Sequence, residues 1–353
     1  MVEYNLYRRI VSNEAGLWAA PIRAGLSAAE WGYRLAIDAR NARFDRLGPR
    51  ETLDVPVISV GNLTVGGTGK TPMVIEVLRR LELMGRSPAV VSRGYKSVGG
   101  EPNDEELLIR SRVPGAVCVA DADRARGARF AISRFGANVI VLDDGFQHRA
   151  LARDLDIVLI DATCPFGFDH LLPRGLLREP VTAIRRAGLI VLTRCDQVSP
   201  HAVNQLDDSL AEIHPAAPRI KSRHRVTAVV TLDDRVVLDS LEGRTAVLFA
   251  GIGQPQSFVT TAQSLGVKVV GERWFPDHHH YTRSDVDRLL ASAAFPPHEV
   301  LLTTEKDAVK LRAMGGWDHA NVWVIRVDID FEADGGKILD DAIKDVLSRK
   351  RGD

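Results

Sequence analysis

The sequence predicts an α/β protein in which a parallel sheet carries helices on both faces. From residue 55 onward, short apolar segments alternate with segments of helical pattern. The apolar segments are almost continuously hydrophobic, as in strands that are buried on both faces. Such alternation indicates parallel strands joined by crossover helices. A smaller C-terminal α/β domain and an N-terminal amphipathic helical segment complete the expected fold.

The composition sets limits on the class of protein. The chain has 353 residues, of which 45% are hydrophobic, and this is enough for two domains with ordinary cores. Its 46 Lys and Arg balance 46 Asp and Glu, which argues against a nucleic-acid partner. Its three cysteines form no CxxC pair, so a reducing compartment is expected rather than a zinc site. With no signal peptide and no apolar run of ~18 residues, a cytoplasmic protein is expected. No obligate protein partner is evident.

Residues 1–50 differ from the rest of the chain. They contain eight Arg against five acidic residues, and apolar side chains including Trp18 and Trp31 recur at helical spacing. Pro21 is expected to separate two helical pieces. One interpretation is a helix that packs on the body and shows its Arg side chains to water. The other is a helix that lies in a membrane interface.

The elements of the first domain are predicted from its apolar runs. Strands are expected at 55–60, 88–94, 137–144, 155–161 and 188–196, with helices at 70–85 and 121–136. The polar, β-like character of 216–245 suggests a linker. A second α/β unit is expected over 246–252, 257–266, 268–275, 299–307 and 322–329.

The first strand leads into a glycine-rich turn that opens a helix at Lys70 and Thr71. Glycines allow backbone N–H groups to close on phosphate oxygens, and the helix N-terminus adds its positive end. Lys70 would reach the β- and γ-phosphates, and the Thr71 hydroxyl would bind Mg²⁺. The first glycine of the usual pattern is replaced by Thr64. A P-loop NTPase-like domain is therefore predicted, the alternative being a turn without ligand, and the loop residues are Thr64, Gly66, Gly67, Thr68 and Gly69.

Asp143 and Asp144 follow an apolar strand, and Gln147 and His148 come soon after. Because ligands bind at the carboxyl ends of parallel strands, a carboxylate here could hold the Mg²⁺ that bridges two phosphates. The alternative is an ordinary Asp-Gly turn. Next to a phosphate loop, the metal-binding interpretation is favoured.

A phosphoryl transferase also needs a carboxylate to orient the acceptor hydroxyl. Asp104 and Glu105 are candidates, although by themselves they are better explained as acids at a helix start. Arg93 and Arg124 either face phosphate or form surface ion pairs. In the turn 274–282, adjacent histidines argue against zinc, and one of them is proposed to tune a carboxylate base; a plain polar turn is the alternative.

Two other classes of protein were considered. The segment LTRCD at 192–196 faintly resembles the guanine-reading motif of GTPases, with Arg194 in place of Lys. A P-loop GTPase or metallochaperone-type switch is therefore one alternative. The other is a nucleotide- or lipid-binding adaptor without catalysis, against which the intact loop and acid pairs argue.

Together these blocks resemble one family, tetraacyldisaccharide 4'-kinase, the lipid A 4'-kinase. The matching blocks follow one another in the family's order and span most of the chain. They are GNLTVGGTGKTP at 61–72, SRGY at 92–95, DE at 104–105, LDDGFQHR at 142–149, LPRGLLREP at 172–180, AGIGQP at 250–255, FPDHH at 275–279 and LTTEKDAVKL at 302–311.

The resemblance implies a reaction and its setting. The family transfers the γ-phosphate of ATP, with Mg²⁺, to the 4'-hydroxyl of a tetraacylated glucosamine disaccharide 1-phosphate in lipid A (lipopolysaccharide) biosynthesis. It implies an active site between a P-loop domain and a smaller C-terminal domain, and peripheral attachment to the cytoplasmic face of the bacterial inner membrane through the N-terminal helix. The expected division is a membrane-associating segment 1–50, a P-loop kinase domain 51–220, a linker 221–245 and a C-terminal domain 246–353.

The resemblance also implies roles for particular residues. The catalytic carboxylate falls on Asp104, with Glu105 beside it and Glu101 as the alternative base. Its partner His278 would reach it when the two domains close. ATP would be held by the loop 64–71, with Lys70 acting in catalysis, and by Arg124, and the substrate by Arg178. The residues on the Mg²⁺ side are Thr71, Asp143, Asp144, Gln147, His148 and Glu179.

Overall fold

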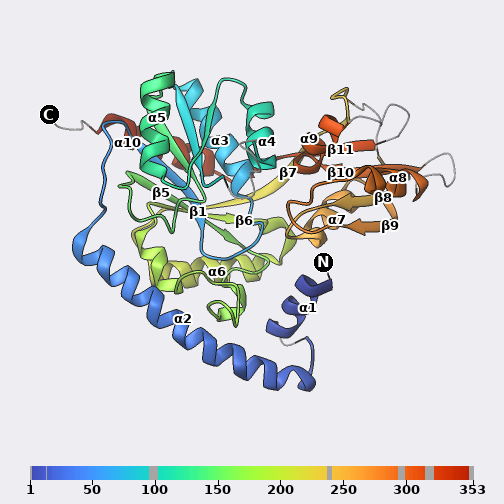
Figure 1. The fold of residues 1–353 in the computed structure, drawn as a ribbon, viewed down its shortest axis with the longest axis horizontal. Helices are drawn as coiled ribbons and strands as arrows, with labels where there is room; N and C mark the ends of the chain where they lie inside the picture. Colours follow the sequence, from blue (N-terminus) through green and yellow to red (C-terminus); the bar gives the residue numbers. More distant parts are fainter. Residues whose placement is uncertain are drawn as a thin grey trace. The chain divides into compact units, whose positions relative to one another are not determined.

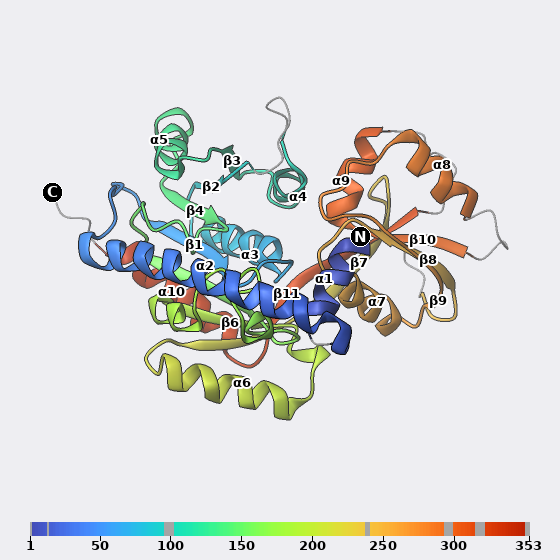
Figure 2. The same cartoon turned by 60° about the horizontal axis from the view of Figure 1, so that its bottom comes forward.

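The computed structural model describes residues 2–12, 14–94, 102–236, 241–292, 299–314 and 322–349. The chain forms two compact units, each made of segments that are distant in the sequence (Figures 1 and 2). The large unit comprises Val2–Tyr95, Arg112–Arg223 and Ile329–Asp353. The small unit comprises Met1, Lys96–Ser111 and His224–Asp328.

The large unit is built on a parallel sheet whose central strands are buried on both faces. Its strands are β1 (Val57–Asn62), β2 (Pro88–Ser92), β3 (Val117–Ala120), β4 (Val139–Asp143), β5 (Leu155–Asp161), β6 (Leu189–Thr193) and the start of β7 (Arg219–Thr231). They are hydrogen-bonded in the order β3-β2-β4-β1-β5-β6-β7. The pairs β1–β4, β1–β5 and β5–β6 are parallel. The predicted parallel sheet is therefore confirmed.

Helices cover both faces of this sheet, and α5 and α6 lie on opposite sides of it (Figures 1 and 2). Alanines of α5 pack against β1, β2 and β4, whereas apolar side chains of α6 pack against β5 and β6. The helices of this unit are α1 (Val2–Val11), α2 (Ala20–Leu47), α3 (Lys70–Leu83), α5 (Arg124–Phe135), α6 (Pro200–Ile213) and α10 (Gly335–Ser348), with short 3-10 turns η1 (Leu17–Ala19), η2 (Gly167–Asp169), η3 (Val181–Arg186) and η4 (Cys195–Gln197).

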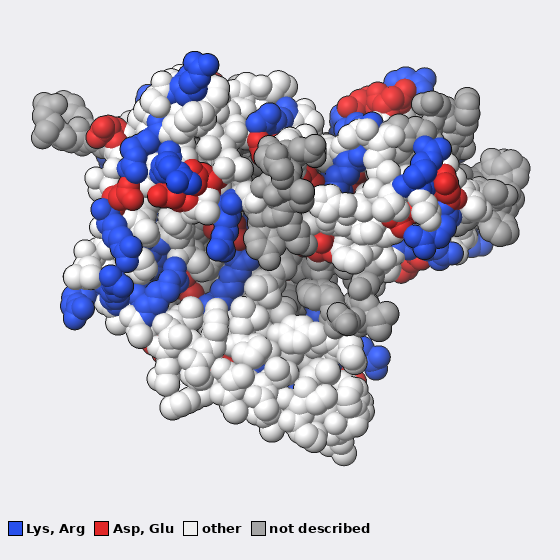
Figure 3. Space-filling view, in the orientation of Figure 1, with Lys and Arg blue, Asp and Glu red and all other residues white. Residues whose placement is uncertain are grey.

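The N-terminal helical segment consists of α1 and the longer α2. Pro21 lies in the first turn of α2, where its missing N–H costs no hydrogen bond, so it marks where this helix begins. Large apolar side chains are exposed on this segment. Trp18, just before α2, is 61% exposed, and Trp31, on α2, is 67% exposed. In Figure 3 the surface over the first half of α2 shows almost no charged side chains, whereas Lys and Arg gather toward the other end of the helix. Of the helices in the described chain, none has the length and apolar character needed to cross a bilayer.

The small unit has its own sheet and core. Its elements are α4 (Asp104–Arg112, as far as Ser111), the end of β7, β8 (Thr245–Ala250), α7 (Pro255–Ser264), β9 (Lys268–Trp274), α8 (Arg283–Ser292), β10 (Glu299–Thr304), α9 (Glu305–Met314) and most of β11 (Val322–Phe331). The order is β11-β10-β8-β9. The pairs β10–β11, β8–β10 and β8–β9 are parallel. One apolar cluster packs α7 and another packs α8 against these strands.

The two units do not follow the linear division expected from the sequence. Residues 221–245 were expected to form a linker, but β7 continues to Thr231 and contributes to both units. The last helix, α10, belongs to the large unit, and residues 96–111 belong to the small one. The physical reason is that β7 leaves the large unit and β11 returns to it, so contacts between distant segments override the order along the chain.

Gly61, near the end of β1, allows a test of how closely this strand packs against Phe146. A Cβ on Gly61 would lie 2.6 Å from Cβ and 2.8 Å from the backbone N of Phe146, a residue that is fully buried. We expect Gly61→Ala to lower the free energy of unfolding by about 1–3 kcal/mol, the usual cost of overpacking. Chemical denaturation monitored by circular dichroism measures this.

Gly32→Ala is the matched control for Gly61→Ala. Gly32 lies on the exposed face of α2, and a Cβ there would meet nothing within 4 Å. It should leave stability unchanged or raise it by up to about 1 kcal/mol. Equal effects of the two substitutions would contradict the packing at β1.

Candidate functional site

The segment between β1 and α3 forms the phosphate loop predicted from the sequence. Gly66 has φ 115° and Gly69 has φ 91°, conformations that favour glycine. Gly69 caps α3 and Lys70 is the first residue of that helix. The backbone N–H groups of the first helical turn therefore have no partner within the helix and are available to an anion.

The loop is held in shape by side chains that bind its backbone carbonyls. The Asn62 amide donates to the Thr64 carbonyl at 2.8 Å, and Thr193 Oγ1 donates to the Thr68 carbonyl at 3.1 Å. Arg194 donates to the Gly67 carbonyl at 2.7 Å and forms an ion pair with Asp161. The loop is thus supported by side chains from the end of β6.

These contacts give the segment 192–196 a role that the sequence did not suggest. Arg194 is buried, lies in the left-handed region with φ 57°, and its guanidinium binds the phosphate loop and Asp161. The structure therefore explains this motif as support for the loop.

Asp143 and Asp144 lie where β4 ends, beside the phosphate loop. Asp143 is buried and pairs in register with Val60 of β1. Asp144 accepts hydrogen bonds of 2.8 and 2.9 Å from Arg178, and its Oδ1 lies 3.5 Å from Lys70 Nζ. Burial raises the pKa of Asp144, but Lys70 and Arg178 outweigh it and lower the pKa to about 2. Asp144 is therefore ionised at neutral pH.

Further predicted residues surround this acid pair. Gln147 accepts from Arg178 at 3.3 Å and donates to the Asn62 carbonyl at 2.9 Å. His148 is neutral at pH 7, because burial and the charges of Arg124 and Arg153 lower its pKa to about 4. Burial also lowers the pKa of Arg124, but the nearby Asp143 and Asp144 favour its charged form.

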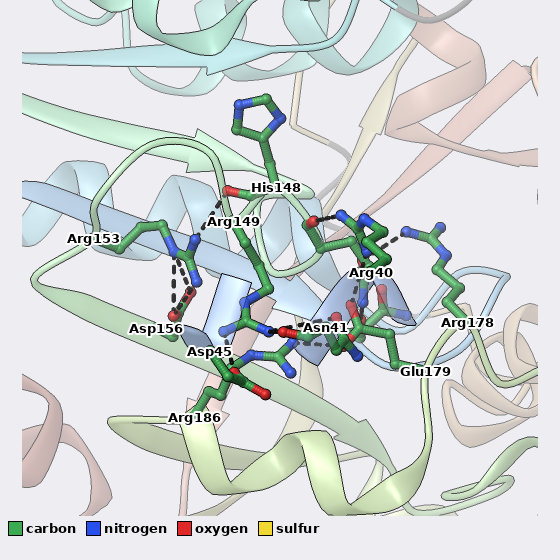
Figure 4. Close-up of polar contacts among 12 residues, drawn as sticks. Arg40, Asn41, Asp45, His148, Arg149, Arg153, Asp156, Arg178, Glu179 and Arg186 are labelled. Carbon is green, nitrogen blue, oxygen red and sulfur yellow. Dashed lines mark hydrogen bonds and ion pairs between the residues drawn. The ribbon is translucent and has the colours of Figure 1, made fainter. Parts of the chain in front are cut away.

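Glu179 lies in a different environment from the other residues predicted near Mg²⁺. It is fully buried, with Arg186 at 2.7 Å, Asn41 at 3.2 Å and Arg40 at 3.6 Å (Figure 4). Among the described residues, no group of three or more His, Cys, Asp or Glu is arranged to hold a metal ion. The roles of the six residues predicted on the metal side therefore stay predictions.

The inward side of α2 binds the residues of this site. Tyr33 donates to the Arg178 carbonyl at 3.0 Å, and Arg40 donates to the Gln147 carbonyl. Asp45, near the end of α2, forms an ion pair of 2.6 Å with Arg149 (Figure 4). The helix that carries the exposed Trp31 is thus hydrogen-bonded to the segments that contribute Arg178 and Gln147.

The small unit contains the predicted pair of Asp104 and His278. His278 lies in the turn after β9 with φ 61°, and its Nδ1 is 2.8 Å from Asp104 Oδ1. Asn103 Oδ1 accepts from the Glu106 N–H at 2.8 Å, so the side chain that caps α4 is Asn103. The Asp104 carboxylate is left to bind His278. Glu101 lies outside the described residues.

The structure corrects the expectation that the two residues of this pair come from different domains. The sequence placed Asp104 and His278 in different domains that must close, but both residues belong to the small unit and are already in contact. The reason is that residues 96–111 group with the C-terminal segments although they precede them by more than a hundred positions.

Two lysines of α9 complete this cluster, and sequence reasoning did not identify them. Lys306 Nζ lies 3.3 Å from His278 Nε2 and 3.0 Å from Asp277 Oδ1. Lys310 Nζ lies 3.4 Å from Asp104 Oδ2. Burial by itself raises the pKa of Asp104, but the hydrogen bond from His278 and the charge of Lys306 hold it well below its ordinary value. The only sequence signal for these lysines was the block 302–311.

Comparisons with known proteins agree with this description. The profile of the family described as Tetraacyldisaccharide-1-P 4'-kinase matches residues 22–345. A protein named tetraacyldisaccharide 4'-kinase from Anaeromyxobacter sp. (strain Fw109-5) is 41% identical over 357 residues, covering 94% of this chain and 95% of its own. The one from Syntrophus aciditrophicus (strain SB) is 41% identical over 308 residues, covering 80% and 82%.

A solved structure is also similar over most of the chain. It is described as an "apo" form of LpxK from Aquifex aeolicus in complex with ATP. It superposes with a TM-score of 0.73 at 31% identity, covering 92% of this chain and 99% of its own. The chain belongs to the tetraacyldisaccharide-1-phosphate 4'-kinase family.

Proposed function

We propose that the protein transfers the γ-phosphate of ATP to the 4'-hydroxyl of a tetraacyldisaccharide 1-phosphate, an acylated glucosamine disaccharide of lipid A biosynthesis. The observation that carries the proposal is the buried Asp104 carboxylate, bound to His278 in a chain that also has a formed phosphate loop. A carboxylate held in this way is suited to accept a proton from a sugar hydroxyl.

The phosphate loop would hold the nucleotide. Its backbone N–H groups and the first turn of α3 supply donors, and Lys70 supplies a cation that now pairs with Asp144. Arg124 and Arg178 would add charge for phosphate or substrate. Since these cations are already placed, little reorganisation is needed when ATP binds.

The donor set beside the loop fits Mg²⁺. This ion prefers oxygen ligands, keeps several waters and is usually bound by one or two carboxylates together with substrate phosphates. The Thr71 hydroxyl and the Asp143 and Asp144 carboxylates supply such oxygens, so a larger acidic cluster is not required. Gln147, His148 and Glu179 are the remaining proposed contacts, and Glu179 would first have to leave its arginines. The ion would supply positive charge against the phosphates.

The transfer step follows from the chemistry of Asp104. The 4'-hydroxyl passes its proton to Asp104 while its oxygen forms a bond to the γ-phosphorus. The bond from that phosphorus to the bridging oxygen breaks, and ADP leaves with the electron pair. Because such transition states are loose, the carboxylate mainly orients the hydroxyl and accepts its proton late. A low pKa of Asp104 is compatible with that role.

We further propose that α2 attaches the protein peripherally to the cytoplasmic face of the inner membrane, where an acylated acceptor resides. Its exposed Trp31 and the preceding Trp18 are suited to the headgroup region, and its Arg side chains to anionic lipid. The helix would hold the protein at the surface without crossing it.

The decisive experiment incubates the protein with γ-phosphate-labelled ATP and a tetraacyldisaccharide 1-phosphate, followed by lipid extraction. Label in the organic phase is expected. A nucleotide-binding adaptor would bind ATP but leave the organic phase unlabelled, and a GTPase-type protein would prefer labelled GTP as the donor.

The pair in the small unit gives the first kinetic prediction. Asp104→Asn and His278→Gln should each lower kcat by about 10²–10⁴-fold, the usual contribution of general-base catalysis. The Kd for ATP, measured by calorimetry, should change little because the phosphate loop is untouched. Full turnover in both variants would remove the pair from the mechanism.

The support of the loop gives the second prediction. Arg194→Met removes the donor to the Gly67 carbonyl and the ion pair with the buried Asp161, so ATP should bind about 10-fold more weakly. Calorimetry checks this, with thermal unfolding to confirm that the variant is folded. Arg185→Met, at an exposed arginine of η3, is the control and should bind ATP normally.

Membrane attachment gives the third prediction. The double variant Trp18→Ser and Trp31→Ser should reduce sedimentation with anionic phospholipid vesicles by at least about 10-fold, because each buried aromatic ring contributes about 1.5–3 kcal/mol. Leu83→Ser is the control, since Leu83 is 88% exposed but lies on α3. A similar loss in the control would indicate nonspecific adsorption instead.

A further inference from the structure

We infer that Lys306 is a positioning residue that fixes which ring nitrogen of His278 carries the proton, and so directs the acceptor proton to Asp104. The inference rests on the proposed function for its kinetic consequence, although the protonation pattern itself can be measured without substrate. The sequence assigned no role to this lysine, whose Nζ lies 3.3 Å from His278 Nε2.

The geometry constrains the hydrogen atoms. A lysine ammonium has three donors and no acceptor, so its contact with Nε2 requires that Nε2 accept. A neutral imidazole with an accepting Nε2 carries its hydrogen on Nδ1. That hydrogen then points to Asp104 Oδ1, which lies 2.8 Å from Nδ1. Both contacts of the ring are therefore satisfied by one tautomer.

Lys306 is held in its charged form by the residues around it. Its Nζ lies 3.0 Å from Asp277 Oδ1 and 3.9 Å from both Asp104 Oδ2 and Glu105 Oε1. Burial lowers the pKa of Lys306, but these three carboxylates outweigh burial and raise it. The ammonium therefore stays a donor at neutral pH.

With Nε2 occupied, Asp104 is left as the proton acceptor. Its Oδ1 already faces His278 and the Glu105 N–H at 3.1 Å. Its Oδ2 is buried and accepts no hydrogen bond from the described residues, although Lys310 Nζ lies 3.4 Å away. Since Nε2 of His278 is already bound by Lys306, the carboxylate of Asp104 and not the imidazole is the acceptor of the hydroxyl proton.

Loss of Lys306 would change the charge on His278. The groups facing the ring are Asp104 from α4, Asp277 from its own turn and Lys306 from α9, with Asp277 Oδ2 3.8 Å from Nε2. Glu105 and Lys310 lie behind these groups: Glu105 Oε1 is 3.9 Å from Lys306 Nζ, and Lys310 Nζ is 3.4 Å from Asp104 Oδ2. Without the ammonium, two carboxylates flank the ring and favour an imidazolium. A charged partner makes Asp104 a weaker base.

The kinetic test follows kcat/KM from about pH 6 to 9 for Lys306→Met. Activity should fall about 10- to 100-fold at pH 6.5, the range expected for losing a charge-assisted contact, and recover as the pH rises. The acidic limb of the profile of kcat/KM against pH should therefore move to higher pH. Adding Asp277→Asn to this variant removes the second carboxylate and should move the limb back. An equal loss at every pH would mean a merely structural role and would overturn the inference.

Lys310→Met is the matched control, because Lys310 lies one helical turn away and contacts Asp104 but has no described contact with His278. It should alter kcat without moving the acidic limb. If both lysine variants shifted the limb equally, a general loss of positive charge would explain the effect and the specific role of Lys306 would be refuted.

The direct test uses the full chain labelled with ¹⁵N-histidine, in which one of the ten histidines is assigned by comparison with His278→Gln. In the unsubstituted protein at neutral pH, His278 should show a protonated Nδ1 and an unprotonated Nε2. In Lys306→Met both nitrogens should be protonated. A neutral ring protonated on Nε2 in the unsubstituted protein would overturn the inference even if the kinase activity were confirmed. Absence of transfer with the expected tautomer would instead refute the proposed function.

Discussion

One constraint applies to both units: the buried Asp104 and the partly exposed Asp144 are kept ionised by neighbouring cations. A buried charge is tolerated only when it is paired and hydrogen-bonded, and removing one partner is costly. In the large unit, Lys70 and Arg178 pair with Asp144. In the small unit, His278 and two lysines pair with Asp104. The cations that stabilise these carboxylates are the ones to which the proposed reaction gives a role in binding phosphate and acceptor.

The two sides of the N-terminal helix α2 have different surroundings. One side of α2 exposes aromatic and aliphatic side chains, while the other donates hydrogen bonds to the carbonyls of Arg178 and Gln147. Tyr33 is held there partly by burial, which together with Glu179 raises its pKa, so the phenol remains a donor. A helix that served only as a membrane anchor would not need these contacts. Its docking therefore also supports the segments that carry Arg178 and Gln147.

Much of the fold could be predicted because its signals are local. The apolar strands, the turn before Lys70 and the acids after β4 each depend on a few consecutive residues, and β1, α3 and β4 appear within a few positions of where they were expected. Helices α6 and α10 were not predicted. The acids at 104 and 105 were harder to interpret, since Asp104 at a helix start has the same local pattern as a capping residue. Only the neighbouring Asn103, which takes the cap, resolves that ambiguity.

The sequence by itself determined the α/β class, the phosphate loop, the acid pairs and the resemblance to a kinase family, because these features depend only on residue type and on spacing along the chain. Tertiary structure alone decided that residues 96–111 join the C-terminal segments, that Arg194 supports the loop, and that Lys306 lies against His278. Each of these depends on contacts between residues far apart in the chain. Local pattern carries no information on such contacts, because packing and charge pairing in the folded protein select them.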